Sequence, residues 1–241
     1  MTTNERGPVG DRSFETVRHR LGMALDETLE TQRAIRRVLP DPVDDKIVLR
    51  CIELALQAPS GSNGQNWEFI VVKDTAVKAS FAEQYRIAWA SYPRDESGLD
   101  GSVGAAVDWQ VEHFEEIPVL VIACLGTDAS GVGAPSPGDP AITVSSFYGS
   151  IYPSVQNLLL AARGFGLGAS LITLPLWSLT HTRRTLGLPE NVTPVCMVPL
   201  GWPRGRYGPT RRRPVVEVVH LDRFGHQPWN AGPDGAPRHA T

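Results

Sequence analysis

The residues best suited to chemistry gather in three short clusters. The first holds Arg33, Arg36 and Arg37 within five positions. On a helix, Arg33 and Arg36 would project to the same side, and such a pair could bind a phosphate through charge-assisted hydrogen bonds. Taken alone, the segment is better explained as a solvated basic face near a helix C-terminus.

The second cluster, residues 58–67, reads APSGSNGQNW and lies between an expected helix and an expected strand. Glycines and short polar side chains allow a loop to bring backbone N–H groups close to a planar polar ligand. An elaborate turn is the alternative. The third cluster, residues 210–214, reads TRRRP, and its arginines could share one anion with the first cluster.

Motifs for other chemistries are missing from the sequence. It holds no GxxxxGK[ST], CxxC, HExxH or GxSxG motif, and its six histidines are isolated, so we predict no metal site. The glycines Gly164, Gly166 and Gly168 end an expected helix and lead into a strand, which favours a helix C-cap over a dinucleotide-binding turn. With no evident nucleophile or base, we expect an organic cofactor to perform the chemistry.

Composition narrows the class of protein further. The chain has 241 residues, 23 Lys and Arg against 26 Asp and Glu, and a pI near 6.1, which gives no global case for nucleic-acid binding. No apolar run approaches the roughly 20 residues of a membrane span. The polar N-terminus lacks a secretory h-region, so we expect a cytoplasmic protein, in which Cys51, Cys124 and Cys196 are buried reduced thiols.

The hydrophobic pattern alternates helices and strands. Helices are expected after Ser13 as far as Leu29, after the caps Asp44 and Asp74, over 145–165 and over 176–186; strands are expected at 68–73, 118–124, 169–174, 194–200 and 215–220. Several of these strands are continuous apolar runs, which predicts a sheet covered by helices on both faces. Residues 1–12 are predicted to be disordered, 13–224 to form a single domain and 225–241 a flexible tail, with 126–140 as a surface loop.

In order along the chain, five motifs resemble those of the FMN-dependent nitroreductase family. The resemblance runs from about residue 28 to 219, and its specificity comes from the order of the motifs. They are QRAIR at 32–36, APSGSNGQNW at 58–67, GLGASLITLP at 166–175, PLGWP at 199–203 and RRRP at 211–214.

The resemblance implies an α+β fold with a central, mainly antiparallel sheet flanked by helices. It also implies an intertwined homodimer with two shared FMN sites. Carried over by position, the arginines would bind the FMN phosphate and ribityl chain, residues of the second cluster would approach the ring from the other subunit, and 172–174 would lie by the isoalloxazine. These cofactor-binding residues are Arg33, Arg36, Pro59, Ser60, Gly61, Asn63, Ile172, Thr173, Leu174 and Arg212.

The sequence departs from the family pattern in places. Gln32 stands where a first basic residue is common, Ala34 where Ser is common, and Asn66 where Pro is usual. One phosphate or ribityl contact is therefore either missing or made by Arg37, Arg211 or Arg213. Relatives carry a substrate lid near 84–109, where this chain has Tyr85, Trp89 and Trp109; these side chains either meet an aromatic substrate or pack the dimer core.

The resemblance implies an NAD(P)H oxidoreductase that reduces nitroaromatic or quinone-like acceptors by ping-pong hydride transfer through FMN. Loop arginines that could meet a 2′-phosphate, namely Arg86, Arg94 and Arg206, favour NADPH over NADH. No catalytic side chain is implied, because the chemistry takes place on the flavin. Residues 109–124 and 173–175 lean toward the iodotyrosine-deiodinase-like branch, although its Glu, Tyr and Lys trio is not found in order. Reductive dehalogenation, flavin fragmentation and non-enzymatic FMN sequestration remain as alternatives.

Overall fold

A computed structural model describes residues 10–93, 101–126 and 139–230 of the chain. Its contacts divide into two units, Met1–Gly208 and Pro209–Thr241. The helices of the first unit are α1 (Phe14–Val17), α2 (Leu25–Thr31), α3 (Asp45–Ala55), α4 (Thr75–Ala90), α6 (Gly101–Glu112), α7 (Pro140–Tyr148), α8 (Tyr152–Phe165) and α9 (Leu179–Leu186). Short 3-10 turns lie at η1 (Arg18–Gly22), η2 (Gly61–Asn63), η3 (Phe114–Glu116) and η4 (Leu174–Leu176).

Four strands form one sheet in the order β1-β2-β4-β3, and every strand pair in it is antiparallel. The strands are β1 (Trp67–Val72), β2 (Val119–Gly126), β3 (Gly168–Ala169) and β4 (Val192–Gly201). In register, Phe69 of β1 faces Ala123 of β2, and Ile122 of β2 faces Met197 of β4. The α+β class with a mainly antiparallel central sheet is therefore confirmed.

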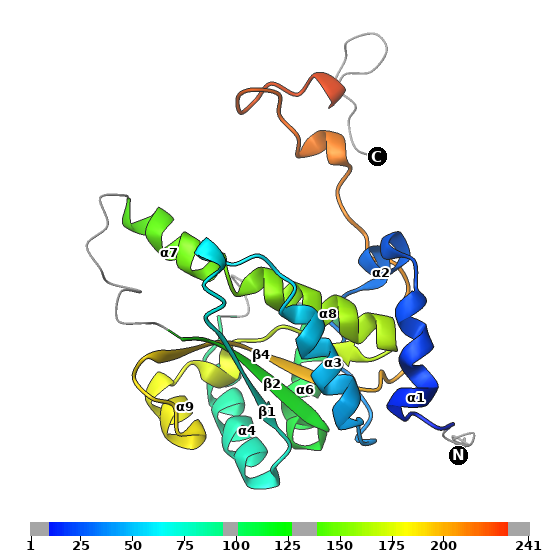
Figure 1. The fold of residues 1–241 in the computed structure, drawn as a ribbon, viewed down its shortest axis with the longest axis vertical. Helices are drawn as coiled ribbons and strands as arrows, with labels where there is room; N and C mark the ends of the chain where they lie inside the picture. The colour runs from blue at the N-terminus through cyan, green and yellow to red at the C-terminus, as the bar shows by residue number, and fades with distance from the viewer. Residues whose placement is uncertain (1–9, 94–100, 127–138, 231–241) are drawn as a thin grey trace. The chain divides into compact units, whose positions relative to one another are not determined.

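Alternate residues of β2 explain why helices cover both faces of the sheet. Val119, Val121 and Ala123 enter one core cluster with α3 and α8, whereas Leu120 and Ile122 enter a second cluster with α4 and α6. A strand whose side chains are all apolar must be buried on both faces. Figure 1 shows the resulting layers, with α3 and α8 over one side of the sheet and α4 and α9 on the other.

Both predicted aspartate caps are present. The Asp44 carboxylate accepts a hydrogen bond from the N–H of Lys46 at the start of α3, and that of Asp74 accepts one from Val77 at the start of α4. At the C-terminal end of α8, Gly166 adopts φ +83° and closes the helix, which confirms the predicted glycine C-cap.

Two long helices expected from the sequence are each broken. The stretch after Ser13 divides into α1, η1 and α2, because the chain becomes extended at Met23, and Leu25 and Leu29 are exposed rather than buried. The stretch over 145–165 divides at Gly149, which caps α7, and Pro153 stands in the first turn of α8. Glycine lowers helix propensity and proline favours a first turn, so each break has a local cause.

Two expected strands are also corrected. In place of a strand over 169–174, only Gly168–Ala169 pairs with β4; a single bridge joins Ile172 to Met197, and Leu174 and Pro175 enter η4. In place of a strand over 215–220, the second unit has the 3-10 turn η5 (Val215–Glu217), followed by η6 (Pro228–Asn230). The predicted loop at 126–140 lies almost wholly outside the described residues.

The three cysteines are free and buried, and burial raises the pKa of each thiol to about 12. Within the described residues, no helix is long and apolar enough to cross a membrane.

Candidate functional site

The first arginine cluster lies on an extended segment, not on a helix. The helix α2 ends at Thr31, and Gln32 already has extended dihedrals. The segment then runs beside β3: Ala34 bridges Ala169, and the N–H of Ile35 donates to the Ala169 carbonyl at 2.8 Å. The expectation that Arg33 and Arg36 share a helical face is therefore wrong, because the segment that holds them is extended and not helical.

Two glycines let this segment approach the sheet. A Cβ on Gly168 would lie 2.6 Å from Ile35 Cγ2, and one on Gly201 would lie 2.9 Å from Val38 Cβ. Both distances are shorter than any ordinary carbon contact, so a side chain at either position would push the segment away. The close approach fixes the position of the arginines between Ile35 and Val38.

Arg33 and Arg36 have different surroundings. Arg33 is exposed, and its guanidinium carbon lies 6.0 Å from the centre of the Tyr207 ring. Arg36 is half-buried, and its Nε is buried without a hydrogen-bond partner among the described residues. A buried donor of this kind is costly unless a ligand or water satisfies it.

The second cluster forms a polar loop with a tightly turned backbone. Ser62, Asn63 and Gln65 have φ values of +51°, +54° and +51°, a region that residues other than glycine seldom adopt. Two serine hydroxyls hold the loop: Ser60 accepts from the N–H of Gln65 at 3.1 Å, and Ser150 accepts from the N–H of Gly61 at 3.0 Å. Such backbone conformations cluster at ligand sites, and Pro59, Gly61 and Asn63 are exposed here.

Residues 172–174, which were expected to lie by the isoalloxazine, turn away from the sheet at Thr173. Ile172 exchanges two backbone hydrogen bonds with Met197, at 2.9 and 2.8 Å. Thr173 is exposed and caps the start of η4, and its carbonyl accepts from the N–H of Leu176 at the end of that turn. Ile172, Thr173 and Leu174 therefore form a fixed corner with Thr173 at the surface.

The predicted substrate aromatics are mostly buried in this chain. Tyr85 is fully buried, and its hydroxyl donates to Gln110 Oε1 at 3.2 Å; burial raises the pKa of Tyr85 to about 12, and the nearby Arg36 charge opposes the rise. Trp89 is buried and donates to Asp108 at 2.7 Å. Trp109 is half-buried, stacks on His113 at 4.2 Å, and lies under the Arg204 guanidinium.

The sequence reading missed the buried partners of Tyr85. Gln110 donates in turn to Ser170 Oγ at 3.1 Å, and both side chains are buried. This chain of hydrogen bonds joins α4 and α6 to Ser170, which comes shortly before the 172–174 corner. The available signals were a lone Gln inside the apolar run of α6 and a lone Ser after β3.

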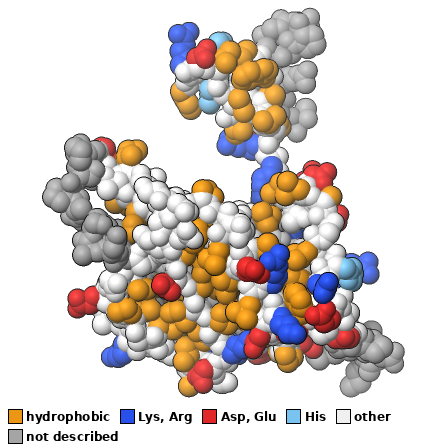
Figure 2. Space-filling model, viewed as in Figure 1, with side chains coloured by type: hydrophobic (Ala, Val, Ile, Leu, Met, Phe, Trp, Pro, Cys, Tyr) orange, Lys and Arg blue, Asp and Glu red, His pale blue; other side chains and the backbone are white. Residues whose placement is uncertain are grey.

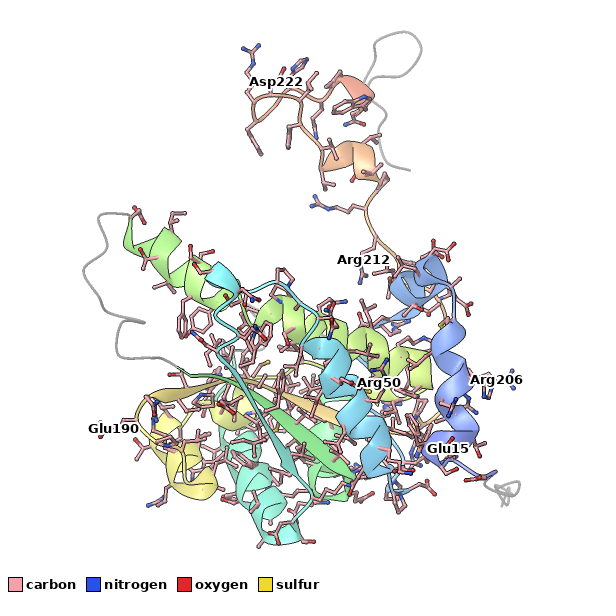
Figure 3. The ribbon with its side chains drawn as sticks, viewed as in Figure 1. Glu15, Arg50, Glu190, Arg206, Arg212 and Asp222 are labelled. Atoms are coloured by element: carbon pink, nitrogen blue, oxygen red, sulfur yellow. The ribbon has the colours of Figure 1, made fainter. Side chains whose placement is uncertain are left out.

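The arginine segment thus lies beside β3 and the end of β4, and the 172–174 corner is joined to β4 at Met197. Arg212 belongs to the second unit, where its Nη1 donates to the Arg211 carbonyl at 2.8 Å. Its convergence with Arg33 and Arg36 stays a prediction. Figure 3 labels Arg212 on the irregular stretch of the second unit that precedes η5.

Comparison with known proteins defines the class. The Nitroreductase family model matches residues 29–202, which is most of the chain, so this chain belongs to the nitroreductase family. The chain is 26% identical over 201 residues to an NADH dehydrogenase of Thermus thermophilus, covering 78% of this chain and 91% of that protein.

A second relative is the 5,6-dimethylbenzimidazole synthase of Rhodospirillum rubrum, which is 28% identical and covers 92% of this chain and 94% of that protein. Among solved structures, an iodotyrosine deiodinase bound to FMN and 3-iodo-L-tyrosine has a TM-score of 0.62 at 21% identity, covering 83% of this chain and all of that one. The structural match confirms the nitroreductase-like fold.

Proposed function

We propose that this chain is an FMN-dependent NAD(P)H oxidoreductase that reduces nitroaromatic or quinone-like acceptors. Family membership supports a redox enzyme, and one relative is named as an NADH dehydrogenase. The observation in the structure that carries the proposal is Arg36, whose buried Nε has no partner among the described residues and sits in the motif that resembles a flavin-binding segment.

The residues present fit FMN in charge and in shape. The phosphate of FMN is an anion that needs charge-assisted partners to leave water, and Arg33 and Arg36 supply two guanidinium groups from one fixed segment. In the proposed dimer, the 60–65 loop of the other subunit would offer exposed backbone and small side chains to the planar ring, since in its own chain this loop lies next to Gly126 and not beside the arginine segment. Arg212 is proposed as a third cation.

A bound FMN would supply the redox chemistry between the nicotinamide donor and the acceptor. The chain orients the ring and shields it. Thr173 presents its backbone at a corner fixed by the paired Ile172, and Arg36 places positive charge beside the buried Tyr85–Gln110–Ser170 chain. Tyr85, Trp89 and Trp109 are proposed to shape the acceptor side, with Trp109 the most accessible of the three.

The reductase is tested by steady-state turnover with NADPH or NADH and a series of acceptors. We expect oxidation of the nicotinamide in the presence of a nitroaromatic or a quinone. The relatives give a second candidate activity, since one is named as a 5,6-dimethylbenzimidazole synthase and another, from rat, as iodotyrosine deiodinase 1. Halide release from a halophenol, or fragmentation of reduced FMN under oxygen, would favour those activities over the reductase.

We further propose a homodimer with shared FMN sites. In the described part of the chain, no strand pairs with the outer edge of β1. A cavity of about 600 Å³ lies beside that strand, with Ile70, Val71 and Leu49 in its wall. Figure 2 shows hydrophobic side chains gathered on this face. The second unit likewise exposes Val215, Phe224 and Trp229. Large apolar surfaces of this kind mark interaction sites.

Light scattering during size-exclusion chromatography tests the dimer. We expect a mass of two chains, and Val71→Asp, which puts a charge on the exposed side of β1, should shift the mass toward one. The matched control Leu25→Asp changes an exposed leucine on α2, away from β1. A wild-type mass of one chain would contradict the dimer. We also propose the cytoplasm as the site of action, which the three free thiols support.

A further inference from the structure

Arg33 lies on a short stretch of chain that is held at both of its ends. On one side, Thr31 is the last residue of α2 and is buried. On the other side, the N–H of Ile35 donates to the Ala169 carbonyl at 2.8 Å. Only residues 32–34 lie between these two points, so the backbone at Arg33 has little freedom once both ends are fixed.

The fixed point at Thr31 is a hydrogen bond from the last turn of α8. Arg163 Nε donates to Thr31 Oγ1 at 2.8 Å, and the Thr31 hydroxyl donates to the Glu27 carbonyl at 2.6 Å. The Thr31 proton is thus committed to Glu27, and the same oxygen accepts from Arg163 with a lone pair. Thr31 is buried and Arg163 is half-buried, and a hydrogen bond from a charged group is stronger in such a place than in water.

The last turn of α8, which carries Arg163, is packed closely on its other side by the N-terminal segment. A Cβ on Gly164 would lie 3.1 Å from Leu21 Cδ2, and the ring centres of Phe14 and Phe165 are 6.1 Å apart. Figure 1 shows α1 and α2 beside this end of α8. Close packing of this kind resists displacement, so Arg163 projects from a fixed turn.

Two consecutive elements, α8 and β3, hold the stretch from Thr31 to Ile35 at both ends. Arg163 binds Thr31 from the last turn of α8, and Ala169, which follows in β3, binds Ile35. A shift of either end would therefore require a shift of α8 or of β3. Arg33 projects from between the two ends, on a backbone that the rest of the first unit holds in place.

We propose that Arg163 and Thr31 are positioning residues of the flavin site, a role that rests on the function proposed above. They hold the start of the arginine segment, so that Arg33 meets the FMN phosphate with its backbone already in place. Such pre-organisation lowers the conformational entropy that is lost on binding. In this role neither Arg163 nor Thr31 touches FMN, and the guanidinium of Arg163 serves Thr31.

Amide hydrogen exchange of the flavin-free chain tests the anchor without any flavin. Thr31→Val keeps the shape of the side chain and removes the oxygen, so exchange at the Ile35 amide should become about tenfold faster, the size of one lost hydrogen bond, while exchange along β2 stays the same. The matched control is Thr28→Val, since Thr28 is equally buried in α2 and its hydroxyl donates to the Ala24 carbonyl at 2.9 Å. Equal exchange at Ile35 in the wild type and in Thr31→Val would overturn the anchor.

Binding of FMN and of riboflavin, which lacks the phosphate, tests the link to the flavin site. Thr31→Val should weaken FMN binding about tenfold and leave riboflavin binding unchanged, because the anchor acts through Arg33 on the phosphate. Thr31→Ser keeps the hydroxyl and should restore FMN binding. Equal losses for both flavins would indicate a merely structural role, and either that result or an unchanged FMN affinity would overturn the proposal.

Arg163→Met separates positioning from direct binding of the phosphate. If Arg163 acts through Thr31, this variant should lose as much FMN affinity as Thr31→Val, and the double variant should lose no more than either one. A loss in Arg163→Met well beyond that in Thr31→Val would show that Arg163 is itself a ligand and would overturn the proposal. A chain that binds no FMN would contradict the proposed function, whereas the exchange experiment would still decide the anchor.

Discussion

At the scale of single residues, Arg36 differs from Arg33 in what surrounds it. The buried Nε of Arg36 has no hydrogen-bond partner among the described residues, which makes the residue costly to the fold and useful to a ligand. Arg33 is exposed beside Tyr207 and carries no such cost.

Replacing Arg36 with Met should therefore separate binding from folding. We expect FMN affinity, measured by quenching of flavin fluorescence, to fall at least tenfold, since one charge-assisted hydrogen bond contributes roughly 1.5–3 kcal/mol. The unfolding midpoint of the flavin-free chain should stay the same or rise, because a buried unpaired donor is removed. The control is Arg184→Met, at an exposed arginine on α9, which should leave FMN affinity unchanged. Equal FMN affinity in R36M and wild type would remove Arg36 from the site.

Gly168 gives a second prediction at this scale. Gly168→Ala should lower the free energy of unfolding by about 1–3 kcal/mol, the range for overpacking, because its Cβ would lie 2.6 Å from Ile35 Cγ2. Gly22→Ala, where nothing lies within 4 Å of the added Cβ, is the control for urea denaturation. Adding Ile35→Ala to Gly168→Ala should restore part of the lost free energy of unfolding. No restoration in this double variant would argue against a contact between positions 168 and 35.

At the scale of elements, Asp44 links two helices through one carboxylate. It accepts from the N–H of Phe14 in α1 and from that of Lys46 in α3, both at 2.9 Å. These two donors lower the pKa of Asp44 below its ordinary value of 3.8. The carboxylate is thus stabilised more in the folded chain than in the unfolded chain.

The contribution of Asp44 to stability depends on pH. Because the pKa of Asp44 is lowered in the folded chain, its carboxylate stabilises the fold at pH values above the ordinary pKa of 3.8, and this stabilisation is lost as the pH falls through the lowered pKa. Asp44→Ala should cost about 0.5–2 kcal/mol at neutral pH, as for other N-caps, and the difference from wild type should shrink in acid. Asp44→Asn should keep most of the cap without the pH dependence. A difference that stays constant down to acid pH would contradict this account.

The elements that could be predicted are those whose signals are local. The apolar run of β2, the capping aspartates of α3 and α4, and the glycine at the end of α8 each act within a few residues. The loop at 58–67 could also be predicted, because a polar, glycine-rich stretch between a helix and a strand is a loop by composition alone.

What could not be predicted depends on partners distant in the sequence. The arginine segment is extended because it lies on Ala169, more than 130 residues away, and no local signal shows that neighbour. Valines over 215–219 have the composition of a strand, but a strand needs a neighbour to complete its hydrogen bonds, and the described part of the second unit contains 3-10 turns instead. The Tyr85–Gln110–Ser170 chain likewise needs three elements to meet.

At the scale of the whole molecule, one sheet carries the site at one edge and an apolar face at the other. β3 and the end of β4 support the arginine segment, whereas β1 at the opposite edge borders the cavity of about 600 Å³. The proposed dimer would cover the apolar face and supply the second half of each flavin site. FMN binding would therefore depend on assembly of the dimer.

The central claim is that the chain is a flavin reductase, and the absorbance spectrum tests it most directly. Purified protein, supplied with FMN, should show flavin bands that bleach under anaerobic NADPH or NADH and return when a quinone or nitroaromatic is added. A flavin that NADPH and NADH leave oxidised but dithionite bleaches would contradict the reductase and indicate sequestration. A chain that binds no FMN would contradict the flavin site itself.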